Sequence, residues 1–275
     1  MWPILFSFGF LTVRTSLVVL LLGFLVAGFA FWCRGKEEHY SEIQLFDGLV
    51  LSFLAGAVGA RLGFIMLHFD QFGLNLFQWL DLVNSPGSLD LMFLVSATYF
   101  LYRFALRKKW DAFEVLDFWA LSLSLWLMFS SLADFVAGTG RGKFTDLFIG
   151  VIFPGSIEKT HPTQLYFALF YLLLSRYLVW AESRYRIFEW YRMGRKSAQT
   201  GFLISNFLIF YSLFSLLMLL FRLPEFVIGS WSFDWLLYLA GMLVGVRILL
   251  RRSDKSFLPL SFKRRFERQD DEVLP

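Results

Sequence analysis

Residues 15–33 read TSLVVLLLGFLVAGFAFWC and contain no charged side chain. A helix needs about 20 mainly apolar residues to cross a bilayer. Backbone groups in lipid must hydrogen-bond within their own segment, so a run of this length predicts a helix and not a barrel strand. The run is longer than the apolar part of a cleaved signal peptide, and Trp32, Cys33 and Arg34 stand where small cleavage-site residues would follow. We therefore predict a retained membrane-spanning helix.

The composition of the whole chain agrees with this stretch. Of the 275 residues, 57% are hydrophobic, 20% are aromatic and only 17% are charged, whereas soluble domains are roughly 45–50% apolar and about 25% charged. These figures exclude a water-soluble globule, a disordered chain, collagen and a disulfide scaffold. The single cysteine, Cys33, excludes an intramolecular disulfide and a cysteine-based metal site. The chain is predicted to be an integral membrane protein with no metal site.

Six further apolar stretches follow, and together they predict an all-α, polytopic bundle of seven transmembrane helices. The predicted helices lie near residues 15–33, 48–68, 91–106, 115–137, 165–181, 201–221 and 234–250. We expect residues 1–252 to form a single transmembrane domain with an outer loop at 138–164, followed by a basic cytoplasmic tail at 253–275. The sequence has no internal repeat and no ring of like charges, which argues against a transporter or channel.

Positive charges alternate between the two sides of the predicted bundle. Lys and Arg mark the cytoplasmic side of short loops; they cluster after the first, third and fifth helices and in the tail, whereas residues 69–90 contain none. The N-terminus is therefore predicted outside and the C-terminus inside. The basic tail is interpreted as an anchor to the anionic inner leaflet. Binding of nucleic acid by this tail is disfavoured, because the tail ends in acidic residues and the chain has no nucleic-acid motif.

Ionisable side chains within the predicted helices are costly in lipid, so each is a candidate functional group. Arg61 lies between Gly59 and Gly63, whose small size lets another helix approach. It could hold a phosphate with two hydrogen bonds or pair with Asp117 or Asp134, and the residues alone leave both open. Asp117 is interpreted as a structural partner near a helix start, whereas Asp134 lies nearer the outer end and is a candidate for a cavity.

The predicted outer loop carries the other candidates. Arg141 and Lys143 alternate with glycines, and such cations and exposed amides favour an anionic group. His161 precedes a proline suited to the first turn of a helix, and Gln164 and Tyr166 follow it. These residues either bind a substrate or tie the loop to the helix end, and the sequence leaves both open.

Several of these stretches, in this order, resemble the prolipoprotein diacylglyceryl transferases of bacteria. The similar pieces are LTVR at 11–14 with LLGFL at 21–25, GARLG at 59–63, RKK at 107–109 with Asp117, TD at 145–146 with GVIFP at 150–154, and HPTQLY at 161–166. The resemblance implies a multi-pass protein of the bacterial inner membrane that transfers the diacylglyceryl group of phosphatidylglycerol to the lipobox cysteine of prolipoproteins. It implies no cofactor. The implied partners are phosphatidylglycerol or another anionic phospholipid, the signal peptides of prolipoproteins and the membrane, but no nucleic acid.

The implied reaction needs two kinds of group. A thiol with a pKa of about 8.5 must lose its proton before it attacks, and the leaving glycerol-1-phosphate needs cations or donors around its phosphate. On this interpretation the candidate catalytic base is His161. The candidate substrate- and lipid-binding residues are Arg61, Arg141, Lys143, Gln164, Tyr166 and Asp134.

The resemblance fails at positions where the family carries its chemistry. The family's histidine-glycine-glycine stretch falls near residues 91–94, which contain neither residue type. Its glycine-arginine signature falls on Ser130 and Ser131. Other positions at which the family carries functional residues fall on or near Ser16, Asp134, Thr139, Ser215 and Leu219 of this sequence. Two interpretations therefore stay open: a rewired transferase, and a non-catalytic lipid- or lipoprotein-binding relative that keeps only the scaffold. The replaced residues predict weak or absent activity.

Overall fold

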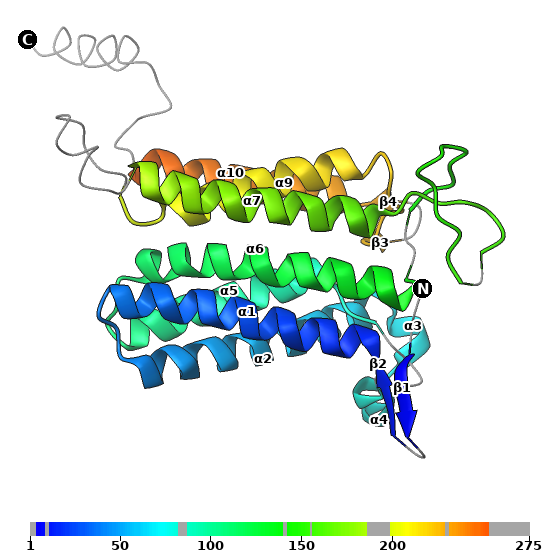
Figure 1. Ribbon diagram of the computed structural model, residues 1–275, viewed down its shortest axis with the longest axis horizontal. Helices are drawn as coiled ribbons and strands as arrows, with labels where there is room; N and C mark the ends of the chain where they lie inside the picture. The colour runs from blue at the N-terminus through cyan, green and yellow to red at the C-terminus, as the bar shows by residue number, and fades with distance from the viewer. Residues whose placement is uncertain are drawn as a thin grey trace, which may run out of the picture.

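The computed structural model describes residues 4–8, 11–81, 87–139, 142–154, 156–185, 199–228 and 231–252. Within these residues the chain is mostly helical (Figure 1). Each segment that was predicted to be a long helix forms one. These helices are α1 (Thr15–Glu37), α2 (Glu42–Leu67), α5 (Asp90–Arg107), α6 (Ala112–Ala137), α7 (Thr163–Tyr185), α9 (Phe202–Met218) and α10 (Asp234–Arg252). The predicted basic tail, 253–275, lies outside the described residues.

Four of these helices are long and apolar enough to cross a membrane, namely α1, α2, α6 and α7. α9 is strongly apolar but only 17 residues long. α5 has 18 residues, and Asp90, Arg103 and Arg107 lower its hydropathy. Long apolar helices of this kind identify a membrane protein.

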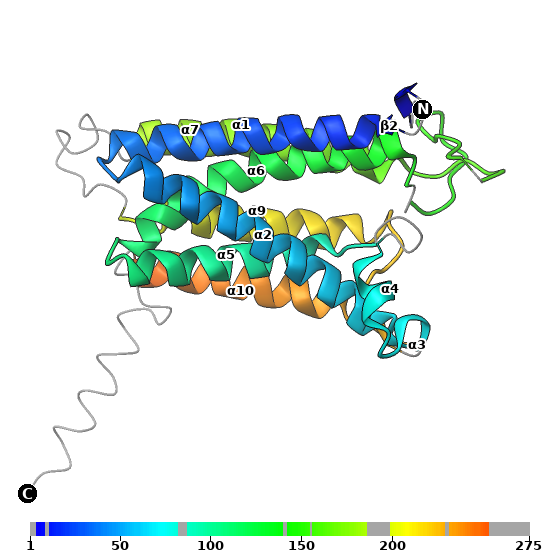
Figure 2. The ribbon, with the colours of Figure 1, turned by 90° about the horizontal axis from the view of Figure 1, so that it is seen from below.

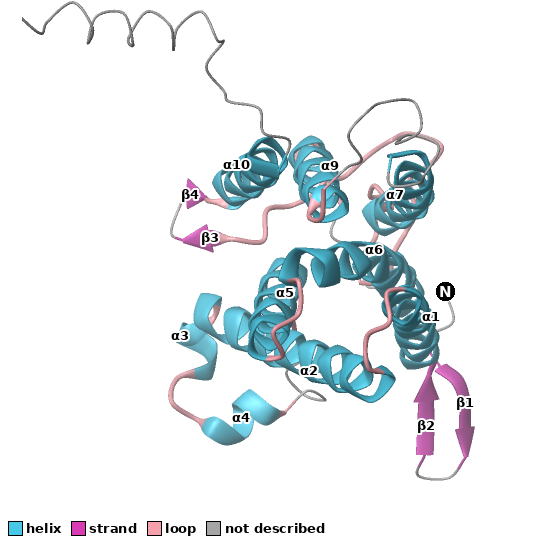
Figure 3. Cartoon of the chain, turned by 90° about the vertical axis from the view of Figure 1, so that its left-hand side faces the viewer, coloured by secondary structure: helices cyan, strands magenta, loops and turns pink. Residues whose placement is uncertain are grey.

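The long helices form two groups, and α6 is the member of the first group that contacts α7 and α9 of the second. α1, α2, α5 and α6 stand around one another, and α7, α9 and α10 lie along one side of that group (Figure 3). α6 contacts α1, α5, α7 and α9, and residues 115–124 within it are all buried. A helix that is apolar and buried all round belongs at the centre of a bundle, and α6 occupies this position.

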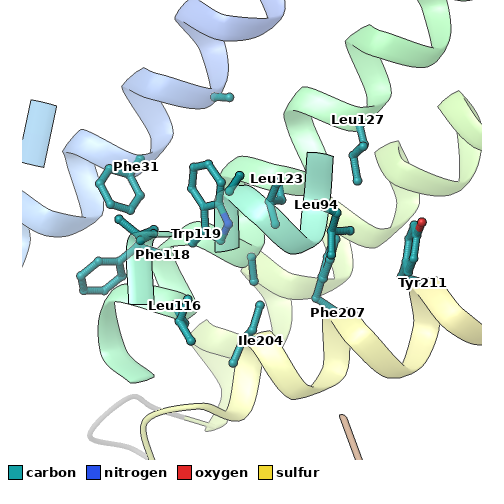
Figure 4. Packing of buried hydrophobic residues seen from close by; sticks show 14 of the residues in the cluster. Phe31, Leu94, Leu116, Phe118, Trp119, Leu123, Leu127, Ile204, Phe207 and Tyr211 are labelled. Atoms are coloured by element: carbon teal, nitrogen blue, oxygen red, sulfur yellow. The ribbon is translucent and has the colours of Figure 1, made fainter. Parts of the chain in front are cut away.

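The core around α6 combines aromatic and aliphatic side chains (Figure 4). The indole of Trp119 is fully buried, packs edge-on against Phe31 with ring centroids 6.0 Å apart, and donates a hydrogen bond of 3.0 Å to the hydroxyl of Thr98. The indole N–H therefore has an acceptor, as a buried polar group requires. Further along the core, the rings of Phe207 and Tyr211 of α9 stack 5.9 Å apart.

Asp117 is a fully buried carboxylate in α6. Its two oxygens accept hydrogen bonds from the backbone N–H groups of Gly201 and Ile204, at 2.8 and 2.9 Å. The first N–H groups of a helix have no partner within the helix, so Asp117 caps the start of α9. The structure thus gives Asp117 the structural role that the sequence indicated.

The two ends of the bundle differ. One end, which we call the hairpin end, carries all the short elements (Figures 1 and 2). These are the β1–β2 hairpin (Ile4–Phe8 and Leu11–Arg14), α3 (Phe69–Phe72), α4 (Leu76–Leu80), residues 142–154 and 156–162, and the β3–β4 pair (Val227–Ile228 and Trp231–Ser232). The other end, the basic end, carries the turns that join α1 to α2 and α5 to α6. Those turns contain or adjoin Arg34, Lys36, Lys108 and Lys109.

Candidate functional site

Polar side chains from five helices surround a small cavity near the hairpin end, where α6 and α9 finish and α5, α7 and α10 begin. Its volume is about 40 Å³, enough for one or two water-sized groups. The polar residues that line it are Asp90, Ser130, Ser131, Asp134, Thr139, Thr163, Gln164, Tyr171, Tyr211, Ser215, Arg222, Glu225 and Tyr238. So many polar groups within an apolar bundle mark a functional site.

Arg222 is the one lysine or arginine among the described residues that line this cavity. It follows α9, its side chain is only 13% exposed, and its guanidinium donates a hydrogen bond to the carboxylate of Glu225. The guanidinium also lies 5.5 Å from the centre of the Phe167 ring. Arg222 stands in a connection between helices, so it is not among the residues predicted from the sequence to form the site. The signal that could have found it is the opposite-charge pair Arg222 and Glu225, separated by Leu-Pro directly after an apolar helix.

Three carboxylates belong to the part of the cavity wall that the structure describes. Asp90 lies in the first turn of α5, Asp134 lies in the last turn of α6, and Glu225 precedes α10. Among the described lining residues, these three carboxylates accompany one guanidinium, that of Arg222. Buried charges are costly unless they are paired, and Arg222 and Glu225 form one such pair within the site.

Gln164 is one of two predicted site residues in the cavity wall, and Asp134 is the other. The Gln164 side chain is 7% exposed, and its amide nitrogen donates to the backbone carbonyl of Thr139. Its carbonyl oxygen, Oε1, is buried and has no hydrogen-bond partner among the described residues. A buried acceptor without a partner costs about 1–3 kcal/mol, so a ligand that donates a hydrogen bond to Oε1 would regain this energy.

His161 and Tyr166 lie together but outside the cavity lining. The His161 side chain is buried, its Nδ1 lies 3.3 Å from the Tyr166 hydroxyl, and its ring packs on Phe221 with centroids 5.1 Å apart. The His161 backbone N–H donates to the carbonyl of Lys143 at 3.0 Å. These contacts tie the segment around Lys143 to the start of α7.

Arg61 contacts the backbone of the segment that follows α3. Its guanidinium donates hydrogen bonds to four backbone carbonyls at the end of α4 and beyond it. These are Gln78 O at 3.1 Å, Trp79 O at 2.9 Å, Asp81 O at 3.2 Å and Gly87 O at 3.2 Å. Cations near a helix C-terminus stabilise its last carbonyls, so Arg61 holds α4 and the following segment against α2.

Lys143 also binds a helix end, because its Nζ donates to the carbonyl of Leu219 at 2.9 Å just after α9. Lys143 lines a second cavity of about 460 Å³ together with Thr160 and residues of the outer loop. Arg141, the remaining candidate, lies outside the described residues. The structure therefore brings Asp134 and Gln164 into one cavity and places Lys143, His161, Tyr166 and Arg61 elsewhere.

The fold and the cavity define a helical membrane protein with a polar site near one end of its bundle, and comparison with known proteins gives its family. Residues 3–251 match the family model for prolipoprotein diacylglyceryl transferase. This match covers most of the chain, so the protein belongs to the prolipoprotein diacylglyceryl transferase family, as the resemblance in the sequence indicated.

Individual relatives agree with the family match. The chain is 31% identical over 240 residues to a phosphatidylglycerol–prolipoprotein diacylglyceryl transferase of Pseudoalteromonas atlantica, covering 84% of this chain and 79% of the relative. It is 30% identical over 243 residues to that of Aeromonas hydrophila, covering 82% and 80%. For the enzyme of Rickettsia bellii the identity is 27% over 268 residues, covering 92% and 96%. Phosphatidylglycerol is the donor that these relatives' names state.

Proposed function

We propose that this protein transfers a diacylglyceryl group from a glycerophospholipid to the cysteine thiol of a lipoprotein precursor, and that the reaction takes place beside Arg222. The observation that carries the proposal is a buried arginine in a polar cavity formed by five helices of a membrane bundle. Ionisable groups within a membrane bundle are costly, so an arginine and three carboxylates at one cavity favour a functional role. The family supplies the reaction class.

The proposed reaction exchanges one bond for another. The thiolate sulfur forms a bond to the terminal glycerol carbon of the diacylglyceryl group, and the bond between that carbon and the phosphate oxygen breaks. The bonding electrons leave with the phosphate, which gains negative charge. Arg222 has five N–H donors, of which the described contact to Glu225 uses one. The others support a role in stabilising the leaving phosphate, since charge-assisted donors act most strongly where charge develops.

The thiol proton needs an acceptor near the same atoms. The carboxylates of Asp90 and Asp134 line the cavity with Arg222, so we assign the general base to one of them. The sequence-based candidate, His161, stays a second proposal for the base. It is favoured less, because its ring packs between Tyr166 and Phe221 and it is absent from the cavity lining.

We further propose that all seven long helices cross the inner membrane as one domain, residues 1–252, with the hairpin end outside. The turns at the basic end contain or adjoin Arg34, Lys36, Lys108 and Lys109, which supports a cytoplasmic location for that end. The tail at 253–275 would then also be cytoplasmic. In this orientation the cavity lies on the outer side, where the signal peptide of a lipoprotein precursor could present its cysteine.

A second candidate function is lipid binding without transfer. The observation in its favour is that Ser130 and Ser131 line the cavity, at positions where the family resemblance leads one to expect an arginine. The one guanidinium in the described lining is also already bonded to Glu225. A scaffold of this kind could hold a phospholipid and a signal peptide without stabilising a leaving phosphate.

The test is a transfer assay with the purified full-length protein in lipid nanodiscs, a lipobox peptide and a phospholipid donor. Mass spectrometry measures the peptide that gains a diacylglyceryl group through a thioether. We expect an adduct with the wild type, and its loss in Arg222→Ala. The matched control is Arg176→Ala, which removes an exposed arginine of α7. No adduct from any donor, with phospholipid still bound, would overturn transfer and support the second candidate.

A further inference from the structure

The second half of α5, which runs to the basic end of the bundle, carries a groove of about 250 Å³. The residues that line it are Tyr99, Phe100, Arg103, Phe104 and Arg107. The tyrosine and both arginines are exposed, and the two phenylalanines are half-buried. The volume is close to the lower end of the range for small-ligand sites, about 300–1,000 Å³. The groove is separate from the Arg222 cavity and shares no lining residue with it.

Two arginines give this groove its charge. Arg103 and Arg107 are four positions apart, so their side chains are neighbours on one face of α5. Two like charges in this arrangement destabilise a helix unless a counter-charge is present. Within the described part of the chain neither guanidinium has a hydrogen bond or an ion pair, and no carboxylate lines the groove. The pair therefore calls for an anion from outside the chain.

The ring of Phe104 forms a fixed apolar surface beside the arginines. It packs against Gly48 of α2, where an added Cβ atom would stand only 3.1 Å from the ring. Its centroid lies 5.9 Å from that of Trp110. The Nζ of Lys108 lies 5.6 Å from the centre of the same ring, so a third positive charge adjoins the groove.

The groove changes in character along the helix axis. Tyr99 and Phe100 lie near the middle of α5, whereas Arg107 is its last residue, and Lys108 and Lys109 follow directly. Aromatic side chains therefore face the middle of the bundle, and cationic side chains face its basic end. A phospholipid of the inner leaflet has the same order, because its acyl chains point to the bilayer centre and its phosphate lies at the cytoplasmic surface.

We propose that this groove binds one anionic phospholipid of the inner leaflet. Its phosphate lies between Arg103 and Arg107, since guanidinium groups bind phosphate oxygens with two parallel hydrogen bonds, and an acyl chain lies along Tyr99 and Phe100. A headgroup that carries an ammonium group fits less well. The described lining offers it no carboxylate, and the guanidinium groups repel it. The preferred lipid therefore carries a net negative charge.

This lipid is distinct from the donor of the transfer reaction. Asp90, which lines the Arg222 cavity, lies in the first turn of α5, about 20 Å along the helix axis from Arg103 at 1.5 Å per residue. The role of the second lipid is to compensate the arginine pair and to hold the end of α5. The inference rests on the proposed function only for the orientation that places the basic end in the cytoplasm.

The experiment is photocrosslinking of the full-length protein in detergent, with the crosslinked residues mapped by peptide mass spectrometry. The probe is phosphatidylglycerol with a diazirine in its headgroup. We expect crosslinks in residues 99–109, and the double variant Arg103→Gln/Arg107→Gln should lower them about tenfold, because it removes the charge-assisted hydrogen bonds. The matched control is Arg176→Gln, which removes an exposed arginine of α7, a helix that contacts α6 and lies away from α5 (Figure 3). It should leave these crosslinks unchanged.

Competition on the wild type tests the choice of ligand without any variant. Unlabelled phosphatidylglycerol should suppress the crosslinks in residues 99–109, and phosphatidylcholine and phosphatidylethanolamine with the same acyl chains should suppress them much less. Inorganic phosphate at millimolar concentration should leave them unchanged. Equal competition by all three lipids, displacement by inorganic phosphate, or crosslinks that survive the double variant would each overturn the inference.

The transfer assay separates this lipid from the donor. The double variant, supplied with excess phosphatidylglycerol, should form the thioether adduct at a rate close to that of the wild type. A loss as large as that expected for Arg222→Ala would overturn the separation of the two lipids. If the wild type formed no adduct, the proposed transfer would fail, whereas crosslinks in residues 99–109 would still support the inner-leaflet site.

Discussion

Two arginines of this protein have opposite environments. Arg61 lies inside a predicted membrane helix between glycines, yet its guanidinium binds four backbone carbonyls at the end of α4. Arg222 lies in a connection between helices, yet it reaches a cavity with carboxylates and tyrosines. The depth of an arginine in a membrane protein therefore does not indicate its role. The atoms around its guanidinium do indicate its role. Backbone carbonyls around the guanidinium indicate that the arginine holds a segment of the chain in place, and a polar cavity beside it indicates a binding site.

The largest expected effect is on the rate of transfer, which should distinguish the role of Arg222 from that of Arg61. Arg222→Ala should lower the rate of transfer by about 10²–10³, the usual effect of removing a donor to developing charge. Arg61→Gln should change the rate less than threefold once the variant is folded. The transfer assay in nanodiscs measures both. A loss of similar size in the two variants would mean that the Arg61 region also contributes to the site.

The second prediction concerns Asp117, which is structural like Arg61 but fully buried. Asp117→Ala leaves two amide groups at the start of α9 without their acceptor. We expect a loss of about 2–4 kcal/mol in the free energy of unfolding, from two unsatisfied buried groups. Thermal unfolding in detergent measures this loss. Ser41→Ala, at an N-cap that makes no side-chain hydrogen bond, is the control and should change the melting temperature little.

The third prediction tests the structural role of Arg61 directly. Arg61→Gln removes most of the donors to the carbonyls of Gln78, Trp79, Asp81 and Gly87. We expect a loss of about 1–3 kcal/mol, together with faster hydrogen exchange in residues 76–81 than in the wild type. Unchanged exchange in that segment would contradict the role assigned to Arg61.

A smaller effect is expected at Tyr40, in the turn between α1 and α2. Burial, together with a 2.6 Å hydrogen bond to Glu114, raises the pKa of the Tyr40 phenol above its usual value. The bond stabilises the fold fully below the unfolded-state pKa of about 10, and the stabilisation is lost as the pH rises above that value. Tyr40→Phe should therefore cost about 1 kcal/mol at pH 7 and progressively less above pH 10. Chemical unfolding at a series of pH values measures the difference, and a cost that stays constant would contradict it.

A small change in the rate of transfer is also expected for His161→Ala. Its ring contacts Tyr166 and Phe221 and is absent from the cavity lining, so we expect less than a tenfold reduction in transfer. Asp90→Asn and Asp134→Asn should be compared with it. If His161→Ala abolished transfer while both aspartate variants kept it, the histidine would be the base after all.

The sequence predicted the helices well because a membrane leaves few choices. Runs such as residues 15–33 have to be helical in lipid, and each of the seven predicted segments is a helix. The short elements α3, α4 and the β1–β2 hairpin were not predicted. Their formation depends on contacts with the long helices, such as those from Arg61 to the end of α4, and local hydrophobic patterns carry little of this information.

The site was predicted only in part, for a related reason. Asp134 and Gln164 were selected because they are polar residues near helix ends, and both line the cavity. Asp90 and Arg222 were not predicted as site residues, because a charged residue beside an apolar run is usually interpreted as lying at the membrane–water interface. Only the crossing of the helices brings them to the same point from α5 and from the end of α9.

By itself, the sequence determined that the protein lies in a membrane, which segments are helical and to which family it belongs. Each of these follows from local composition or from the order of short motifs along the chain. Only the tertiary structure decided that Arg61 binds carbonyls, that His161 packs on aromatic rings, and that Arg222 shares a cavity with three carboxylates. The reason is physical: the free energy of a charge depends on the few atoms within about 4–6 Å of it, and folding chooses those atoms from segments far apart in the chain.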